Sequence, residues 1–167
     1  MEQIITKHPK EALCKPGCAD CCHAVFDVSF IEAAYLASFL NSHKDILNEQ
    51  QQFAEQAALQ FEQLIKTGDN PSTSRIRCPA LAEDNLCLAH KVRPVNCRTY
   101  GTPTIIDGTS HVCGLSGFDS KEKYATIDLA PLQKSLNEYS IELVGNDFGN
   151  RRFPIAWVFL RLDYFLK

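Results

Sequence analysis

Apolar residues recur at helical spacing early in the chain. Between residues 30 and 41 they fall three or four positions apart, or side by side, at Ile31, Ala34, Tyr35 and Phe39. This is the pattern of one face of an α-helix. Ser29 precedes the stretch and Glu32 follows three residues later, which is the sequence of a capping box. We therefore predict a helix over about residues 30–41 that begins after Ser29.

A longer repeat with nearly the same period follows. Ser42 and Asp45 are suited to cap its start, and Gly68 is a typical helix stop. Its apolar positions are Ile46, Phe53, Ala57, Phe61, Leu64 and Ile65. The other positions are rich in Gln and Glu, so we expect a long amphipathic helix with that face in solvent.

Helical patterns return near the C-terminus. Residues 128–144 contain Pro131, which is tolerated only in a first turn, and are followed by Gly145. One predicted face carries Leu132, Leu136, Tyr139 and Leu143. A last helix is predicted over 155–166, opened by Pro154. It is apolar enough to be a buried core helix, and the alternative is that it covers the surface of a protein partner.

The segment between residues 78 and 113 has no helical period and many turn signals. Residues 83–85 predict a tight hairpin between Cys78 and Cys87, and Asp107-Gly108 predicts another between strands 104–106 and 111–113. Residues 25–28 are expected to be extended. We therefore predict an α+β fold that is predominantly α: one domain over residues 1–167, with a small helical bundle and a cysteine-rich, short-stranded hairpin region docked on it.

Composition excludes several classes of function. The 167 residues carry a net charge of −3, with no basic run, so nucleic acid is not an expected partner. No apolar stretch approaches the length of a membrane span, and residues 1–10 lack the apolar core of a signal peptide. We therefore expect a cytoplasmic protein that does not enter a membrane.

Cysteine is the residue type that changes this picture. The chain has eight cysteines, namely Cys14, Cys18, Cys21, Cys22, Cys78, Cys87, Cys97 and Cys113. In a reducing compartment such a cluster indicates metal ligands rather than disulfides. Thiolate sulfur is a soft ligand that favours zinc, copper(I) or an iron–sulfur cluster. The turn-forming run Lys15-Pro16-Gly17 lets a short loop direct several sulfurs to one point.

The spacing of the first four cysteines restricts how they can act. Adjacent side chains diverge on a regular helix or strand, so Cys21 and Cys22 are not expected to share one mononuclear centre. One of them should join Cys14 and Cys18, while the other faces elsewhere. The spacing of Cys14, Cys18 and Cys21 also matches the three-cysteine motif by which radical S-adenosylmethionine enzymes hold a [4Fe–4S] cluster. The chain lacks the length and alternating strand–helix pattern of the barrel of those enzymes, so we do not expect it to belong to that enzyme family. The loop could still hold a [4Fe–4S] cluster, with a distant cysteine as fourth ligand.

Other residues near the cysteines have competing interpretations. Three histidines are not needed as ligands, because eight thiols suffice: His23, His90 and His111. Arg93 and Arg98 either offset the charge of a thiolate cluster or bond to turns. Tyr100 and Trp157 are expected to belong to the core.

Five short pieces of the sequence occur in an order that resembles a known family. They are Cys14-x3-Cys18-x2-Cys21-Cys22, Cys78-Pro79-Ala80-Leu81, Asp84-Asn85-Leu86-Cys87, Arg93-Pro94-x2-Cys97-Arg98-x-Tyr100, and Cys113. The chain is similar over about residues 14–113 to the cysteine-cluster family described as a putative zinc- or iron-chelating domain, which includes relatives of flagellin lysine N-methylases. The resemblance implies metal binding and leaves open both the metal and any catalytic activity.

Three functional hypotheses follow. The first is a cysteine-ligated metal-binding protein with zinc or an iron–sulfur cluster, in which the centre is structural or regulatory. The second is an iron–sulfur protein with redox or methyl-transfer activity. The third is a thiol-based redox sensor, in which spare cysteines such as Cys22 pair on oxidation. The first two predict the same ligands and differ in whether a reaction is catalysed.

Overall fold

A computed structural model describes residues 1–71, 73–106, 108–119 and 121–166 of the chain. The helices are α1 Glu2–Lys7, α2 Phe30–Asn41, α3 Lys44–Thr67, α4 Val95–Thr99, α5 Ala130–Val144, α6 Asn146–Gly149, α7 Ile155–Leu160 and α8 Leu162–Phe165, with short 3-10 turns at Asp20–Cys22 and His90–Val92. The strands are β1 Asp27–Ser29, β2 Thr104–Ile106, β3 Thr109–His111, β4 Ile127–Asp128 and β5 Arg152–Pro154. The predicted α+β class, mostly α, is confirmed.

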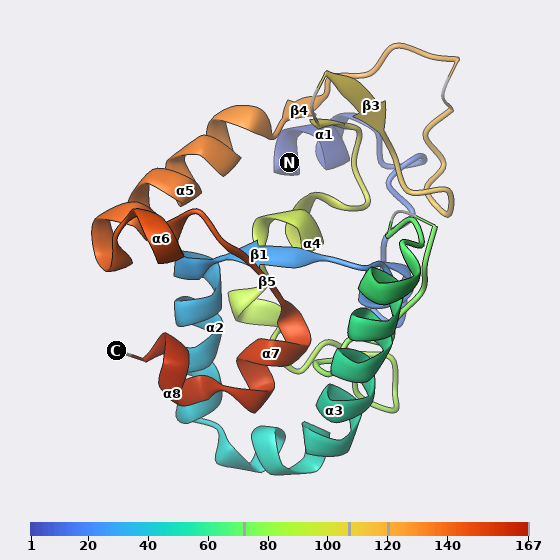
Figure 1. Cartoon of the computed structure of the whole chain (residues 1–167). Coiled ribbons are helices and arrows are strands. Elements are labelled where there is room, and N and C mark those ends of the chain that lie inside the picture. The colour runs from blue at the N-terminus through green and yellow to red at the C-terminus, as the bar shows by residue number, and fades with distance from the viewer. Residues whose placement is uncertain (72, 107, 120, 167) are drawn as a thin grey trace.

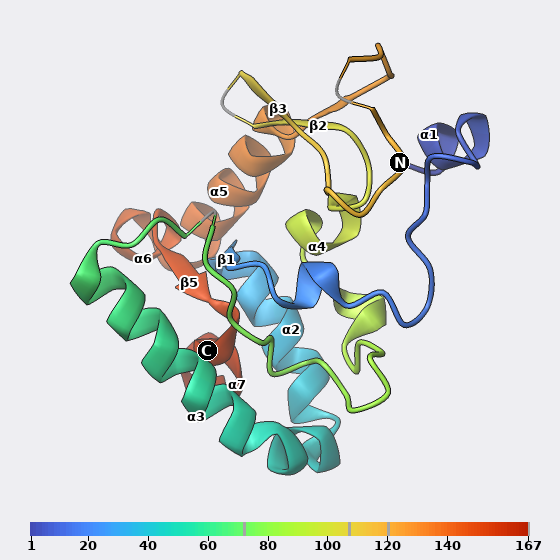
Figure 2. The same ribbon diagram turned by 90° about the vertical axis from the view of Figure 1, so that its right-hand side faces the viewer.

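The molecule has a helical part and a loop-rich part. In Figure 1 the helices α2, α3, α7 and α8 gather in the lower half, while α1, β3 and β4 lie at the top. Figure 2 shows α1 standing apart from the helical core and connected to it by a long, irregular segment. Two small sheets join distant parts of the sequence: β1 pairs antiparallel with β5, and β2 lies between β3 and β4. The sheets therefore fasten the cysteine-bearing segments to the helices.

Helix α2 is the centre of the hydrophobic core. Its residues Leu36 and Leu40 are fully buried, together with Val28 of β1 and Val158 of α7. The predicted apolar face is wrong, because none of its four positions is among the buried residues, which are Phe30, Ala33, Leu36, Ala37 and Leu40. Tyr35 is 59% exposed. Helix α2 is apolar on nearly all sides, so its sequence does not specify which face is buried.

The predicted capping box at the start of α2 is confirmed and has a second role. The backbone N–H of Ser29 donates to Glu32 Oε2 at 2.9 Å. The other carboxylate oxygen of Glu32 accepts a hydrogen bond of 2.9 Å from the backbone N–H of Val95. One carboxylate therefore caps α2 and fixes the first residue of α4, the short helix that carries Cys97.

Helix α3 differs from its prediction at its N-terminal end, while its C-terminal end is as predicted. His43, not Ser42, is its N-cap residue, and the Ser42 hydroxyl donates to the carbonyl of Ser38 in α2 instead. The predicted stop is confirmed, because Gly68 adopts the left-handed conformation with φ of 71°. Ile65 was expected on the apolar face but is 60% exposed.

The C-terminal helices correct two further predictions. Helix α5 has Pro131 in its first turn and ends at Gly145, as predicted, but Leu132, Tyr139 and Leu143 lie on its exposed side. The buried residue of α5 is Ser140, whose hydroxyl oxygen accepts a hydrogen bond from the backbone of α2. Helix α5 therefore meets α2 at the small side chain of Ser140, and not through Leu132 or Leu143.

The predicted last helix is broken into α7 and α8. The break lies at Arg161, whose φ of −136° and ψ of 47° are not helical. Phe159 and Phe165 are buried as expected for core residues, whereas Trp157 is 41% exposed and so does not belong to the core. Within the described residues, no helix is long and apolar enough to cross a membrane.

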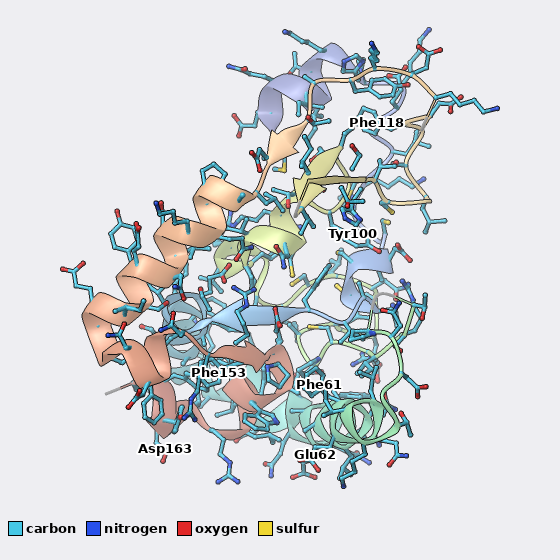
Figure 3. All side chains as sticks on the ribbon, turned by 45° about the horizontal axis from the view of Figure 1, so that its top comes forward. Phe61, Glu62, Tyr100, Phe118, Phe153 and Asp163 are labelled. Atoms are coloured by element: carbon cyan, nitrogen blue, oxygen red, sulfur yellow. The ribbon has the colours of Figure 1, made fainter. Side chains whose placement is uncertain are left out.

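The loop-rich part has a small aromatic cluster of its own. His8, at the end of α1, makes edge contacts with Phe118 and Tyr124, and Figure 3 shows Phe118 beside α1 at the top of the molecule. The backbone N–H of Gly117 donates to the carbonyl of Glu11 at 2.8 Å. These contacts hold the residues before Cys14 against the chain that follows Cys113.

Candidate metal centre

All eight cysteines line one cavity of about 480 Å³. Cys14 is exposed, Cys22 is buried, and the others are intermediate. The cavity lies where the N-terminal loop meets the segment from residue 78 to 116. The fold therefore gathers around one space the cysteines that the sequence identified in two separate groups.

The N-terminal loop turns sharply before its cysteines, as predicted. Gly17 has a positive φ of 86°, and the backbone N–H of Cys18 donates to the carbonyl of Lys15 at 3.0 Å. Such a φ favours glycine. A second glycine, Gly101, lets the residues after α4 approach this loop closely, because a Cβ added to Gly101 would stand only 3.1 Å from Cβ of Cys14. Sequence analysis did not single out Gly101.

Backbone pairing brings the two cysteine groups together. The N–H of Cys78 donates to the carbonyl of Cys22 at 2.7 Å, and the N–H of Ile76 donates to the carbonyl of His23 at 3.0 Å. Ala24 and Arg75 form an antiparallel bridge beside them. This short pairing connects residues more than fifty positions apart, and it places Cys78 next to the double cysteine.

The predicted hairpin between Cys78 and Cys87 is present in a tighter form. Asn85 has a positive φ of 62° in the turn, and the bridge partner of Cys87 is Leu81, not Cys78. The other predicted hairpin pairs β2 with β3, although β3 covers residues 109–111 and leaves Cys113 beyond the strand. Gly108 has a φ of 74°, while Asp107 lies outside the described residues.

Asp20 joins four segments at the cavity wall and was missed by sequence analysis. Its carboxylate is paired with Arg75 and accepts a hydrogen bond of 3.0 Å from the Tyr100 hydroxyl. The Cys113 thiol also donates to it at 3.4 Å. Burial opposes ionisation of Asp20, but the hydrogen bonds from Arg75, Tyr100 and Cys113 outweigh it and lower the pKa of the carboxyl. Tyr100 is a cavity-wall residue with this polar contact, which differs from the core role expected for it.

The arrangement of Cys21 and Cys22 corrects an expectation. Their sulfur atoms lie 4.0 Å apart, in the 3-10 turn Asp20–Cys22. Two sulfurs on one tetrahedral zinc, each bound at about 2.3 Å, stand roughly 3.8 Å apart. The adjacent side chains therefore do not diverge, because this tight turn is neither the regular helix nor the strand for which divergence was argued.

The cysteine thiols differ in how readily they ionise. A hydrogen bond with Cys22 lowers the pKa of Cys21 to about 7, and a second one, again with Cys22, lowers the pKa of Cys87 to about 7. The same two contacts raise the pKa of Cys22, which keeps its proton between them. Burial raises the pKa of Cys78 to about 12. Cys21 and Cys87 are therefore the thiols closest to the thiolate form that binds metals at neutral pH.

The two arginines near the cavity have different roles. Arg98 bonds to a turn, since its guanidinium donates to the carbonyls of Arg93 and Lys91 at 2.6 and 2.7 Å. Burial raises the pKa of Cys14, and the positive charge of Arg93 offsets only part of this rise. Hydrogen bonds with Cys22 lower the pKa of Cys21 and Cys87, and the charge of Arg93 lowers both further. Within the part of the chain that the structure describes, Nε of Arg93 is buried and has no hydrogen-bond partner.

The histidines contribute less to the cavity. His90 is among its lining residues. His23 lies in the N-terminal loop, where its Nδ1 is 3.0 Å from the carbonyl oxygen of Ala19, and His111 is exposed in β3.

The donor set fits a zinc ion or an iron–sulfur cluster by its chemistry. Thiolate sulfur is a soft ligand that suits both, and Arg93, whose buried Nε has no hydrogen-bond partner among the described residues, lines the same cavity as the thiols. Across residues 1–71, 73–106, 108–119 and 121–166, however, no three Cys, His, Asp or Glu side chains are grouped closely enough to hold an ion as they stand. The cysteines thus line one cavity, but in this structure their sulfurs are not close enough together to coordinate an ion.

Comparison with known proteins agrees with this chemistry. Residues 13–116 match the family model CxxCxxCC, described as a putative zinc- or iron-chelating domain. Neither the curated proteins nor the solved structures contain a match. The matched range covers more than half of the chain and includes all eight cysteines. The chain therefore belongs to the CxxCxxCC family of putative zinc- or iron-chelating domains.

Proposed function

We propose that the chain is a cysteine-ligated metal-binding protein in which zinc or an iron–sulfur cluster has a structural or regulatory role. The observation that supports this most strongly is the single cavity lined by all eight cysteines. The ligands proposed are Cys14, Cys18, Cys21, Cys22, Cys78, Cys87, Cys97 and Cys113. The bound group would supply metal–sulfur bonds between the N-terminal loop and the hairpin segment.

The hairpin segment has little apolar packing with which to stabilise itself. Among the described residues between 78 and 113, few apolar side chains are buried, including Pro79, Ala80, Leu81, Ala89 and Val92. Ordering a residue costs about 1–2 kcal/mol in backbone entropy alone. Binding of one zinc ion by cysteines in small domains contributes about 10–16 kcal/mol, as much as the net stability of a whole domain. A metal centre is therefore large enough to hold this segment in place.

Chelation tests the structural role. The protein is purified without oxygen or added metal, its metals are measured, and thermal unfolding is followed by circular dichroism before and after treatment with a strong chelator. We expect stoichiometric zinc or iron and a large fall in the melting temperature once it is removed. Unchanged melting after verified metal removal would show that the centre does not stabilise the fold.

The absorption spectrum of the same sample separates the two metals. An iron–sulfur cluster gives a brown protein with sulfide-to-iron absorption at about 400 nm. Zinc bound by thiolates leaves the protein colourless. Because the cysteine thiols must lose their protons to become ligands, binding of either metal should weaken as the pH falls below neutrality.

The surroundings of the Cys22 thiol favour a thiol redox sensor as a second candidate function. The sulfur of Cys22 lies 4.0 Å from that of Cys21 and also contacts the thiol of Cys87. Oxidation of two such thiols by hydrogen peroxide would form one disulfide and two water molecules. Thiol counting on the metal-free protein, before and after mild peroxide, tests this candidate: a loss of two reactive thiols that dithiothreitol restores is expected, and an unchanged count excludes it.

A further inference from the structure

Two segments far apart in the sequence form a small unit beside the cysteine cavity. We call this unit the flap, and it consists of residues 1–13, 114–119 and 121–126. His8, which follows α1, makes edge contacts with Phe118 and Tyr124. The rings of Phe118 and Tyr124 also meet edge to face, with 4.9 Å between their centroids. The aromatic contacts of the flap are therefore made between its own two segments, and Figure 2 shows α1 to one side of the helical core.

The flap is attached to the rest of the molecule by few polar contacts. One hydrogen bond joins its two segments, from the backbone N–H of Gly117 to the carbonyl of Glu11 at 2.8 Å. Leu115 and Ser116 donate hydrogen bonds only to the adjoining Cys113. Among the described residues, no other hydrogen bond or salt bridge joins the flap to the body of the protein. Opening of the flap would therefore break few interactions, which is the property of a segment that opens locally.

The flap forms one side of the cysteine cavity. Met1, Ile5 and Leu115 of the flap line the cavity, and all three residues are exposed. Leu86 of the hairpin lines the same cavity from the body of the protein and is exposed as well. Inward movement of the flap would bury these apolar side chains further, which is favourable in water. The flap therefore has an apolar surface with which it can close.

The flap joins the body at two of the cysteines. Its first segment ends at Cys14, against which Gly101 packs so closely that an added Cβ would stand 3.1 Å from the Cβ of Cys14. Its second segment begins after Cys113, whose thiol donates to the Asp20 carboxylate at 3.4 Å. Both cysteines line the cavity. A group bound by these two thiols would hold both attachment points of the flap.

We infer that the flap is a lid over the cysteine cavity, which opens as one piece to admit metal and closes over the occupied centre. This inference rests on the proposed metal-binding function and adds how the centre is reached and retained.

Gly117→Ala is the variant that disrupts the flap. An added Cβ would stand 3.0 Å from the Cα of Glu11 and 3.2 Å from the carbonyl oxygen of Lys10, so the two segments must separate. Gly114→Ala is the matched control in the same segment, because its Cβ would meet nothing within 4 Å. Native mass spectrometry counts the zinc ions bound to each variant, and transfer of zinc to a coloured chelator is followed over time.

We expect Gly117→Ala to bind as many zinc ions as the wild type and to release them faster. The expected increase is about twofold to tenfold, which corresponds to the net contribution of one hydrogen bond to the closed state. Gly114→Ala should release zinc at the wild-type rate. Equal release rates in Gly117→Ala and the wild type overturn the lid, and so does an equal increase in both variants.

Hydrogen exchange of the wild-type chain tests the movement without a variant, and it decides the matter if Gly117→Ala does not fold. The N–H groups of His8, Ala12 and Gly117 all donate within the flap. If the flap opens as one piece, these three groups should exchange with similar protection, well below that of α2, and bound zinc should slow all three together. Protection equal to that of α2, or protection that zinc leaves unchanged, overturns the inference.

The two proposals fail in different ways. A wild-type protein that binds neither zinc nor iron contradicts the proposed function. The flap is then tested on the metal-free chain by the rate at which its thiols react with an aromatic disulfide reagent: Gly117→Ala should react faster than Gly114→Ala, and equal rates overturn the lid as well. A protein that binds zinc but releases it equally fast from both variants retains the proposed function and loses only the lid.

Discussion

Replacing Asp20 by asparagine tests whether its carboxylate organises the cysteine cavity. The change keeps the shape of the side chain and removes its charge. Asp20 is 17% exposed and pairs with an Arg75 side chain that is 49% exposed, so the ion pair alone should contribute only about 0.2–1 kcal/mol. The Tyr100 hydroxyl adds a hydrogen bond to a charged acceptor, which contributes about 1.5–3 kcal/mol when fully buried and less in this half-buried position.

We therefore expect Asp20→Asn to lower the free energy of unfolding by about 1–2 kcal/mol near neutral pH. Asp27→Asn is the matched control. Asp27 also pairs with an arginine, Arg152, at 3.0 Å, but it lies in β1 and is partly exposed. We expect it to cost no more than about 1 kcal/mol. Urea unfolding of both variants, with and without bound metal, gives the comparison.

The pH dependence gives a second measurement for Asp20. Its folded-state pKa is lowered below the ordinary value of 3.8, so its contribution to stability is fully present above that value. The contribution is lost as the pH falls through the lower, folded-state pKa. The difference in stability between wild type and Asp20→Asn should therefore shrink on acidification. Equal effects of the two asparagine variants at neutral pH, together with a difference that does not change with pH, would refute the role assigned to Asp20.

Two glycine substitutions, with a third as control, test close packing. In Gly101→Ala the added Cβ should push against Cys14, destabilise the protein by about 1 kcal/mol and weaken metal retention against a chelator. In the control Gly114→Ala the added Cβ meets nothing within 4 Å, so this variant should be neutral or slightly stabilising. Equal metal retention in the two variants would contradict the prediction. Gly149→Ala should destabilise more, by about 3 kcal/mol, since its Cβ would stand 2.5 Å from the backbone of Ile141. Urea unfolding measures this, and a loss near that of Gly101→Ala would show that α5 and α6 separate easily.

Sequence alone determined those elements that depend on neighbouring residues. The capping box of Ser29 and Glu32, the helix stop at Gly68 and the turn at Gly17 are each specified within a few positions of the chain. The eight cysteines likewise identify soft-metal chemistry without coordinates, because no other residue type supplies thiolates. These features were predicted correctly because their physical cause is local.

Tertiary structure decided which surfaces meet. Leu132 and Leu143 of α5 are exposed while Ser140 is buried, since a helix face is buried only where another element packs against it. The pairing of Cys22 with Cys78, and the carboxylate of Asp20 between Arg75, Tyr100 and Cys113, join residues that lie far apart in sequence. No repeat or spacing encodes such contacts. They form because the other helices pack around α2 in the core and thereby bring the loops that carry the thiols to one side of it.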